Sequence, residues 1–142
     1  MGDAARLIGT SWQSGGYWTV PGKLEVLAPY TQDTIDDLFP GIDVLLSPSQ
    51  VKEPFGLTVR EALVRNVWVV ATNAGGTVND LRHGESAAII PLDSDYNKLK
   101  LAIEECMGKE DWDSYVNPYR SEITSYSEQA AELSGLFESI AN

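Results

Sequence analysis

A short run of apolar residues, Val67-Trp-Val-Val-Ala71, places the tightest constraint on how this 142-residue chain can fold. Its β-branched residues and its polar boundaries indicate a β-strand. A strand without a polar face is typical of a parallel sheet that is covered on both sides. The run Ile42-Asp-Val-Leu-Leu46 is almost as apolar, and Ala87-Ala-Ile-Ile90 is a third such run, which Pro91 ends. The sequence therefore predicts at least three buried strands.

Segments with helical signals separate these runs and follow them. They cover residues 31–39, 59–64, 77–82, 96–107 and 127–140, with Thr31 and Thr77 as the expected N-caps of their helices. Residues 23–28 alternate between polar and apolar and predict a further strand. Strands that alternate with helices in this way are typical of βαβ units and a parallel sheet. An unrelated doubly wound domain with a flavodoxin-like strand order would show the same pattern.

The length of 142 residues favours one α/β domain, a parallel sheet flanked by helices. Residues 1–23 are the exception. They are rich in Gly, Ser and aromatic residues without a clear period, so we expect a poorly defined N-terminal segment. Within it, Arg6-Leu-Ile-Gly9 fits either a strand or a short helix.

The charge of the chain argues against nucleic-acid binding. Its formal net charge is −11, its pI is about 4.3, and its 10 Lys and Arg residues are scattered along the sequence. Such a field repels a phosphate backbone unless a basic patch opposes it. Backbone N–H groups act locally, so the acidity still permits a small anionic ligand.

The single cysteine, Cys106, has no partner for an internal disulfide and no Cys or His at metal-ligand spacing. The N-terminus lacks the apolar core of a signal peptide, and no apolar run is long enough to cross a bilayer. We therefore expect a cytoplasmic protein without a membrane span and without a metal site.

The stretch between the apolar runs at residues 42–46 and 67–71 carries the strongest functional signal. A strand that ends in a loop and enters a helix at Gly56-Leu-Thr58 directs free backbone N–H groups toward an anion such as phosphate. The pattern Thr58-Val-Arg-Glu61 also fits a capping box, in which both side chains serve the helix and no ligand. Another polar turn, Thr72-Asn-Ala-Gly-Gly76, follows the next strand, and the only histidine, His83, ends the helix expected after it.

These residues resemble a known family. The stretch Glu53-Pro-Phe-Gly-Leu-Thr-Val-Arg-Glu61-Ala, preceded by Asp43-Val-Leu-Leu-Ser-Pro-Ser49, is similar to the signature of the retaining glycosyltransferases of family 4. That group is glycogen-synthase-like and has the GT-B fold. Val69-Val-Ala-Thr-Asn-Ala-Gly-Gly76 and His83-Gly-Glu85 match it in order and spacing. The resemblance covers residues 24–141 and implies the C-terminal, Rossmann-like half, which holds a nucleotide diphosphate sugar.

The resemblance also implies roles for single residues. Glu53 would be the catalytic carboxylate, beside the donor sugar, where its charge suits an oxocarbenium-like transition state. Glu61 would accept hydrogen bonds from the ribose hydroxyls. The residues that would hold the sugar and the diphosphate through the opening of the helix are Phe55, Gly56, Leu57 and Thr58. No metal or other cofactor is implied, because the helix terminus and basic side chains neutralise the leaving group.

Parts of the family pattern have no counterpart here. We expect the chain to begin inside the domain, without its first strand and helix, and without the acceptor-binding N-terminal half. Transfer needs a positioned acceptor, so we expect the isolated chain to be inactive. A missing strand would leave a sheet edge or an apolar face open, which favours self-association or a partner subunit. The alternative hypothesis is a non-catalytic nucleotide-binding or interaction module derived from the same fold.

Overall fold

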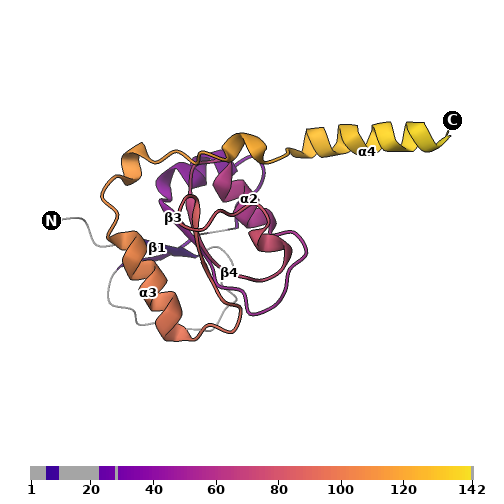
Figure 1. The fold of residues 1–142 in the computed structure, drawn as a ribbon. Helices are drawn as coiled ribbons and strands as arrows, with labels where there is room; N and C mark the ends of the chain where they lie inside the picture. Colours follow the sequence, from indigo (N-terminus) through magenta and orange to yellow (C-terminus); the bar gives the residue numbers. More distant parts are fainter. Residues whose placement is uncertain (1–5, 10–22, 28, 142) are drawn as a thin grey trace. The chain divides into compact units, whose positions relative to one another are not determined.

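The computed structural model describes residues 6–9, 23–27 and 29–141, and side chains from residue 27 onward apart from residue 28 (Figure 1). The chain divides into two compact units, residues 1–38 and 39–142. Of the N-terminal segment 1–23, only residues 6–9 and 23 are described. They belong to strands, which resolves the choice between strand and helix at residues 6–9.

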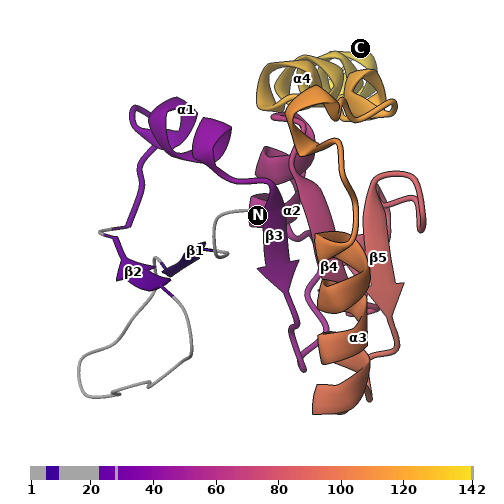
Figure 2. The ribbon, with the colours of Figure 1, turned by 90° about the vertical axis from the view of Figure 1, so that its left-hand side faces the viewer.

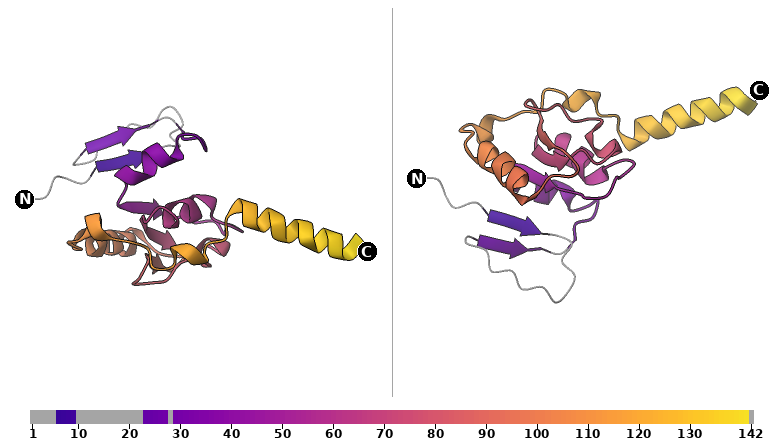
Figure 3. Two further views of the ribbon diagram at one scale, coloured as in Figure 1. Left: turned by 90° about the horizontal axis from the view of Figure 1, so that it is seen from above. Right: turned by 60° about the horizontal axis from the view of Figure 1, so that its bottom comes forward.

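The first unit contains a pair of short parallel strands. β1 (Arg6–Gly9) and β2 (Lys23–Val26) run side by side with Arg6 opposite Lys23 (Figure 3). The helix expected over residues 31–39 is wrong in length, because α1 spans only Ile35–Leu38. The backbone N–H of Thr31 donates to Oγ1 of Thr34 at 2.9 Å. This local bond favours a turn over residues 32–34, so Thr31 does not act as the side-chain N-cap.

The second unit is built on a three-stranded parallel sheet in the order β3-β4-β5. β3 (Val44–Ser47), β4 (Trp68–Thr72) and β5 (Ala87–Ile90) follow one another in sequence and in space. Val44 lies opposite Trp68, and Val69 lies opposite Ala87. All five residues of the central strand β4 are buried, as its composition predicts.

Helices cover both faces of this sheet. Figure 2 shows α3 (Tyr96–Met107) in front of β4 and β5, and α2 (Leu57–Leu63) behind the sheet. Successive strand residues point to opposite faces, so Trp68 and Val70 lie on the α3 side and Val69 and Ala71 on the other. The buried cluster on the α3 side contains Trp68, Val70, Ala88, Ile90, Ala102 and Cys106.

The remaining elements are short turns and one long helix. The 3₁₀ turns are η1 (Phe39–Gly41), η2 (Gly76–Val78), η3 (Trp112–Ser114) and η4 (Arg120–Glu122). The last helix, α4 (Tyr126–Ala141), contains no buried residue, although it carries a series of large apolar side chains.

The sequence pattern predicts most of the second unit well. The α/β class with a helix-flanked parallel sheet is confirmed, and β5 and α3 have the expected bounds. The strands expected at 42–46 and 67–71 begin two residues and one residue later. The helix expected at 77–82 is wrong, because only η2 forms there. Thr77 lies inside η2 and is 3% exposed, so it does not cap a helix.

Candidate functional site

The candidate site begins where the chain returns to the sheet after β3. The chain leaves the sheet at Ser47, and the hydroxyl of Thr72 donates to the carbonyl of Ser49 at 2.5 Å. Glu53 then pairs with Gly75 in an isolated parallel bridge. The Glu53 N–H donates to the Ala74 carbonyl at 2.9 Å, and the Gly76 N–H donates to the Glu53 carbonyl at 2.8 Å. The backbone of Glu53 is thus fixed while its side chain stays exposed.

Helix α2 opens directly after this bridge. Its N-cap is Gly56, which has φ 66° and ψ 55°, the left-handed region that favours glycine. The first amide to reach back to the cap is that of Arg60, which donates to the Gly56 carbonyl at 3.2 Å. The N–H groups of Leu57, Thr58 and Val59 therefore lie outside the ladder of intrahelical bonds, as in the first turn of any helix.

The capping box that Thr58 and Glu61 could form is not present. No side chain caps α2, because the helix begins at Leu57 and Thr58 already lies within its first turn. Thr58 is exposed and Glu61 is half-buried. The backbone carbonyl of Glu61 accepts a hydrogen bond from Nη1 of Arg65 at 3.0 Å. The alternative in which these two side chains serve only to cap the helix is thereby removed.

An ion pair that the sequence does not reveal lies next to the loop of residues 53–56. The Arg60 guanidinium lies 4.4 Å from the centroid of the Phe55 ring, and its Nε lies 2.7 Å from Oδ2 of Asp80. The Arg60 side chain is only 15% exposed. Arg60 and Asp80 are 20 positions apart in the sequence, and only the fold brings them together. No pattern in the sequence indicates this contact.

All six predicted site residues lie in one continuous segment, residues 53–61, at the carboxyl end of β3 and the start of α2. The turn after β4, residues 74–77, packs directly against this segment. Ligands of open parallel sheets bind at this edge, beyond the carboxyl ends of the strands. The arrangement offers backbone donors for an anion and, in Glu53 and Glu61, carboxylate acceptors for hydroxyl groups.

His83 has a different role from the one expected. Its Nδ1 accepts a hydrogen bond from the backbone N–H of Ile89 at 2.9 Å, and it forms a bridge with Ala87. It therefore supports the start of β5 and does not end a helix.

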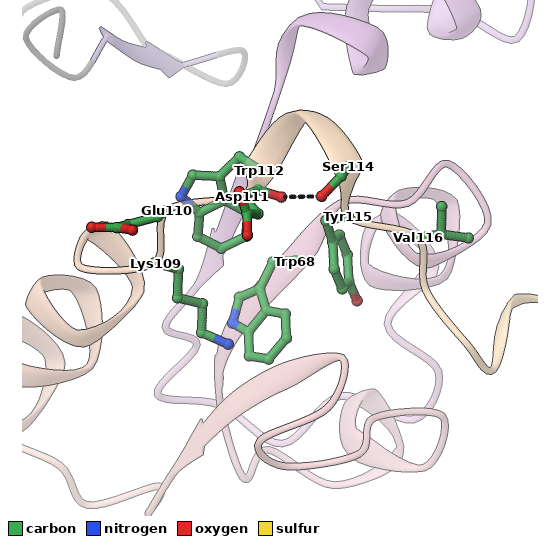
Figure 4. A pocket seen from close by; sticks show the side chains of 8 residues that line it. All are labelled: Trp68, Lys109, Glu110, Asp111, Trp112, Ser114, Tyr115 and Val116. Atoms are coloured by element: carbon green, nitrogen blue, oxygen red, sulfur yellow. Dashed lines mark hydrogen bonds between the residues drawn. The ribbon is translucent and has the colours of Figure 1, made fainter.

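An open pocket of about 530 Å³ lies near Trp68, the first residue of β4, away from the strand end that leads toward Glu53 (Figure 4). The rings of Trp68, Trp112 and Tyr115 meet edge to face, with centroids 5.5 to 6.2 Å apart. Nζ of Lys109 lies 3.3 Å from the Trp68 ring centroid. Burial raises the pKa of Tyr115 to about 12. Burial likewise raises the pKa of Cys106, and the Lys109 charge opposes that shift.

Two further observations concern only the residues that the structure describes. Within them, no three His, Cys, Asp or Glu side chains gather closely enough to hold a metal ion. In the same part of the chain, no helix combines the length and the apolar character that crossing a bilayer requires.

Solved structures share this fold. Sucrose-phosphate synthase from Thermosynechococcus elongatus is 20% identical with a TM-score of 0.73, and the match covers 83% of this chain and 30% of that one. A glycosyltransferase from Rickettsia africae is 19% identical with a TM-score of 0.70, and the match covers 84% of this chain and 32% of that one. Anabaena HepE in complex with UDP-glucose is 21% identical with a TM-score of 0.63, and the match covers 82% of this chain and 32% of that one. The chain thus spans about a third of the length of each of these proteins.

Among curated proteins, none matches this chain significantly. The model of one protein family does match, over residues 20–129, and its description reads "Glycosyl transferases group 1". This range includes the whole candidate site and more than half of the chain. The fold agrees with the family, because a parallel sheet flanked by helices forms the Rossmann-like half of the GT-B glycosyltransferases. The chain therefore belongs to the group 1 glycosyl transferases.

Proposed function

We propose that this chain is the donor-binding part of a retaining glycosyltransferase, which transfers a sugar from a nucleotide diphosphate sugar to a hydroxyl group of an acceptor. The observation that carries the proposal is the family match over residues 20–129, which includes every predicted site residue. The HepE structures with UDP-glucose and UDP support a uridine nucleotide as the first donor to test.

The proposed reaction breaks the bond between the anomeric carbon and the diphosphate oxygen. The bonding electrons leave with the nucleotide diphosphate, the acceptor oxygen bonds to the carbon on the same face, and the proton of the acceptor hydroxyl passes to the departing diphosphate oxygen. Positive charge develops at the sugar, where the Glu53 carboxylate would stabilise it. The first-turn amides of α2 would donate to the diphosphate, and Glu61 would accept from the ribose hydroxyls.

A second part of the proposal concerns the acceptor. Because the chain spans about a third of the length of the similar structures, we propose that the acceptor binds to a different part of such an enzyme. Without a positioned acceptor, the effective concentration that accelerates transfer is lost. We therefore expect this chain to bind the donor without transferring the sugar.

The first experiment measures thermal unfolding of the chain with and without millimolar UDP or UDP-glucose. A ligand that binds only the native state raises the melting temperature. The double variant Glu61→Ala/Gly56→Val should lose this shift, because it removes an acceptor and forces a side chain onto a left-handed cap next to Thr77. Glu132→Ala, an exposed acid on α4, is the matched control and should keep the shift.

A folded sample that shows no shift at millimolar UDP or UDP-glucose would contradict the donor site. GDP is tested beside UDP, so that a different base preference is recognised as such. If both nucleotides raise the melting temperature but the double variant responds like the unmodified chain, the nucleotide binds elsewhere and the assignment of residues 53–61 is wrong.

A further inference from the structure

The loop of residues 53–56 contacts the turn after β4, residues 74–77. This contact extends the sheet beyond its regular strands. β3 ends at Ser47, yet Glu53 and Gly75 again pair in parallel. Two backbone hydrogen bonds close this bridge. The Glu53 N–H donates to the Ala74 carbonyl at 2.9 Å, and the Gly76 N–H donates to the Glu53 carbonyl at 2.8 Å. The backbone of the proposed catalytic residue is therefore held by peptide groups of the neighbouring turn.

This approach is possible only because the turn contains two glycines. A Cβ atom on Gly76 would lie 1.8 Å from the carbonyl oxygen of Pro54 and 2.5 Å from its carbonyl carbon. A Cβ atom on Gly75 would lie 2.9 Å from the Glu53 carbonyl oxygen, and φ of Gly75 is +80°. The obstructing atoms belong to the backbone, so no change of a side-chain rotamer can make room for a Cβ atom at position 75 or 76.

A third contact fixes the far end of the same loop. A Cβ atom on Gly56 would lie 2.8 Å from Cα of Thr77. Pro54 and Phe55 thus lie in the chain between Glu53 and Gly56, both of which contact the turn of residues 74–77. Movement of that turn would necessarily move Glu53 and Phe55.

We propose that Gly76, together with Gly75, is a positioning element for Glu53 that sets how the carboxylate meets the donor sugar. The inference rests on the proposed function and adds to it, because the glycines act through Glu53 and need no contact with the ligand. It makes a specific claim about binding. The loss of Gly76 should weaken recognition of the sugar more than recognition of the nucleotide.

The first arm of the test needs no ligand. Amide hydrogen exchange is followed by NMR in the unmodified chain, in Gly76→Ala and in the control Gly41→Ala, where an added Cβ meets nothing within 4 Å. Gly76→Ala should speed exchange at Glu53 and at residue 76 by about tenfold or more. The amides of Trp68 and Asn73 bond elsewhere in the sheet and should keep their protection.

The second arm compares the dissociation constants of UDP-glucose and UDP. Gly76→Ala should weaken UDP-glucose more than UDP. Glu53→Gln should do the same, and the double variant should be no worse than the more severe single one. Equal weakening of both ligands would indicate general damage to the fold and would overturn the proposal. So would exchange at Glu53 that Gly76→Ala leaves unchanged.

The two arms also separate this inference from the proposed function. If the unmodified chain binds neither ligand, the donor site is wrong, while the exchange data still decide whether the glycines hold Glu53. If Gly76→Ala does not fold, amide exchange in the unmodified chain decides whether the glycines hold Glu53. Equal opening free energies for the Glu53 and Gly76 amides support the positioning contact, and exchange of either at the rate of an unstructured peptide overturns it.

Discussion

Arg60 is a side chain that links residues 53–56 to the rest of the second unit, in addition to the backbone contacts at Glu53. Its guanidinium stacks on Phe55 and its Nε pairs with Asp80, so one side chain contacts both the loop and the segment after η2. A planar guanidinium can stack and form an ion pair at the same time, and a lysine ammonium cannot do this equally well. Arg60→Lys is therefore not a conservative change at this position.

The coupling between Arg60 and Asp80 can be measured with a double-mutant cycle. Both side chains are mostly shielded, with 15% and 27% exposed, so we expect a coupling free energy of about 1 kcal/mol. The measurement is urea unfolding of the unmodified chain, Arg60→Ala, Asp80→Ala and the double variant. Strictly additive losses of stability would show that the pair contributes nothing as a pair.

Tyr115 gives a pH-dependent prediction. Burial raises its pKa in the folded protein to about 12, from the ordinary 10.0. The folded state therefore keeps this proton where the unfolded chain has already lost it. The stability from this group is complete below pH 10 and is lost as the pH rises from 10 through 12.

Absorbance at 295 nm, which reports phenolate formation, tests this expectation. The chain has six tyrosines, and Tyr115→Phe should remove a phenolate step near pH 12. If the variant loses an earlier step instead, the phenol of Tyr115 is accessible to water and burial does not control it.

Among the elements, the two helices α2 and α4 show how the same local pattern can lead to different outcomes. Thr58-Val-Arg-Glu61 and Ser125-Tyr-Ser-Glu128 both fit a capping box. Only the second one forms. The Ser125 N–H donates to Oε2 of Glu128 at 2.7 Å, and the Glu128 N–H donates to Oγ of Ser125 at 3.3 Å. At α2, Gly56 starts the helix earlier, so Thr58 is already inside it.

The box on α4 makes the helix sensitive to acid. Hydrogen bonds from the Ser125 backbone and hydroxyl lower the pKa of Glu128. Capping by the carboxylate is therefore present above the ordinary glutamate pKa and is lost as the pH falls through the lowered value. We expect NMR Cα shifts of residues 126–130 to lose helical character on acidification. Glu128→Gln should reduce that character already at neutral pH, and Glu132→Gln should not.

Two elements that the sequence predicts accurately, β5 and α3, each have a clear local signal at one end. β5 ends at Pro91, and α3 begins after Asp95, whose Oδ1 accepts from the Lys98 N–H at 3.0 Å. In the two helices that are predicted wrongly, the threonine expected as the N-cap does not cap a helix. At residues 31–39 a threonine bond favours a turn, and at 77–82 the contact with Glu53 determines the path of the chain.

At the scale of the whole molecule, we expect the second unit to fold without its last helix. α4 contains no buried residue and contributes no side chain to the buried cluster on the α3 side. We expect removal of residues 125–142 to leave the melting temperature of the remaining chain almost unchanged, because little apolar surface is lost from the core. Differential scanning calorimetry of both chains is the measurement. A drop of many degrees would mean that α4 stabilises the fold.

Only part of the candidate site could be predicted from the sequence. Residues 53–61 are contiguous, so their order alone indicates a loop that enters a helix. The ion pair between Arg60 and Asp80 and the contact of Gly76 with Pro54 join distant positions and are determined by how β3 and β4 pair. Periodicity and propensity describe neighbours along the chain, and they carry no information about such contacts.

The bridge at Glu53 also bears on which substitutions a protein of this kind can accept. Peptide groups hold the acid in place, and every residue except proline supplies the same peptide groups. The side chains of Val51 and Lys52 are exposed and can therefore vary freely without moving the carboxylate. Positions 75 and 76 have no such freedom, so a saturation library of the chain should keep glycine there while its neighbours in the loop diversify.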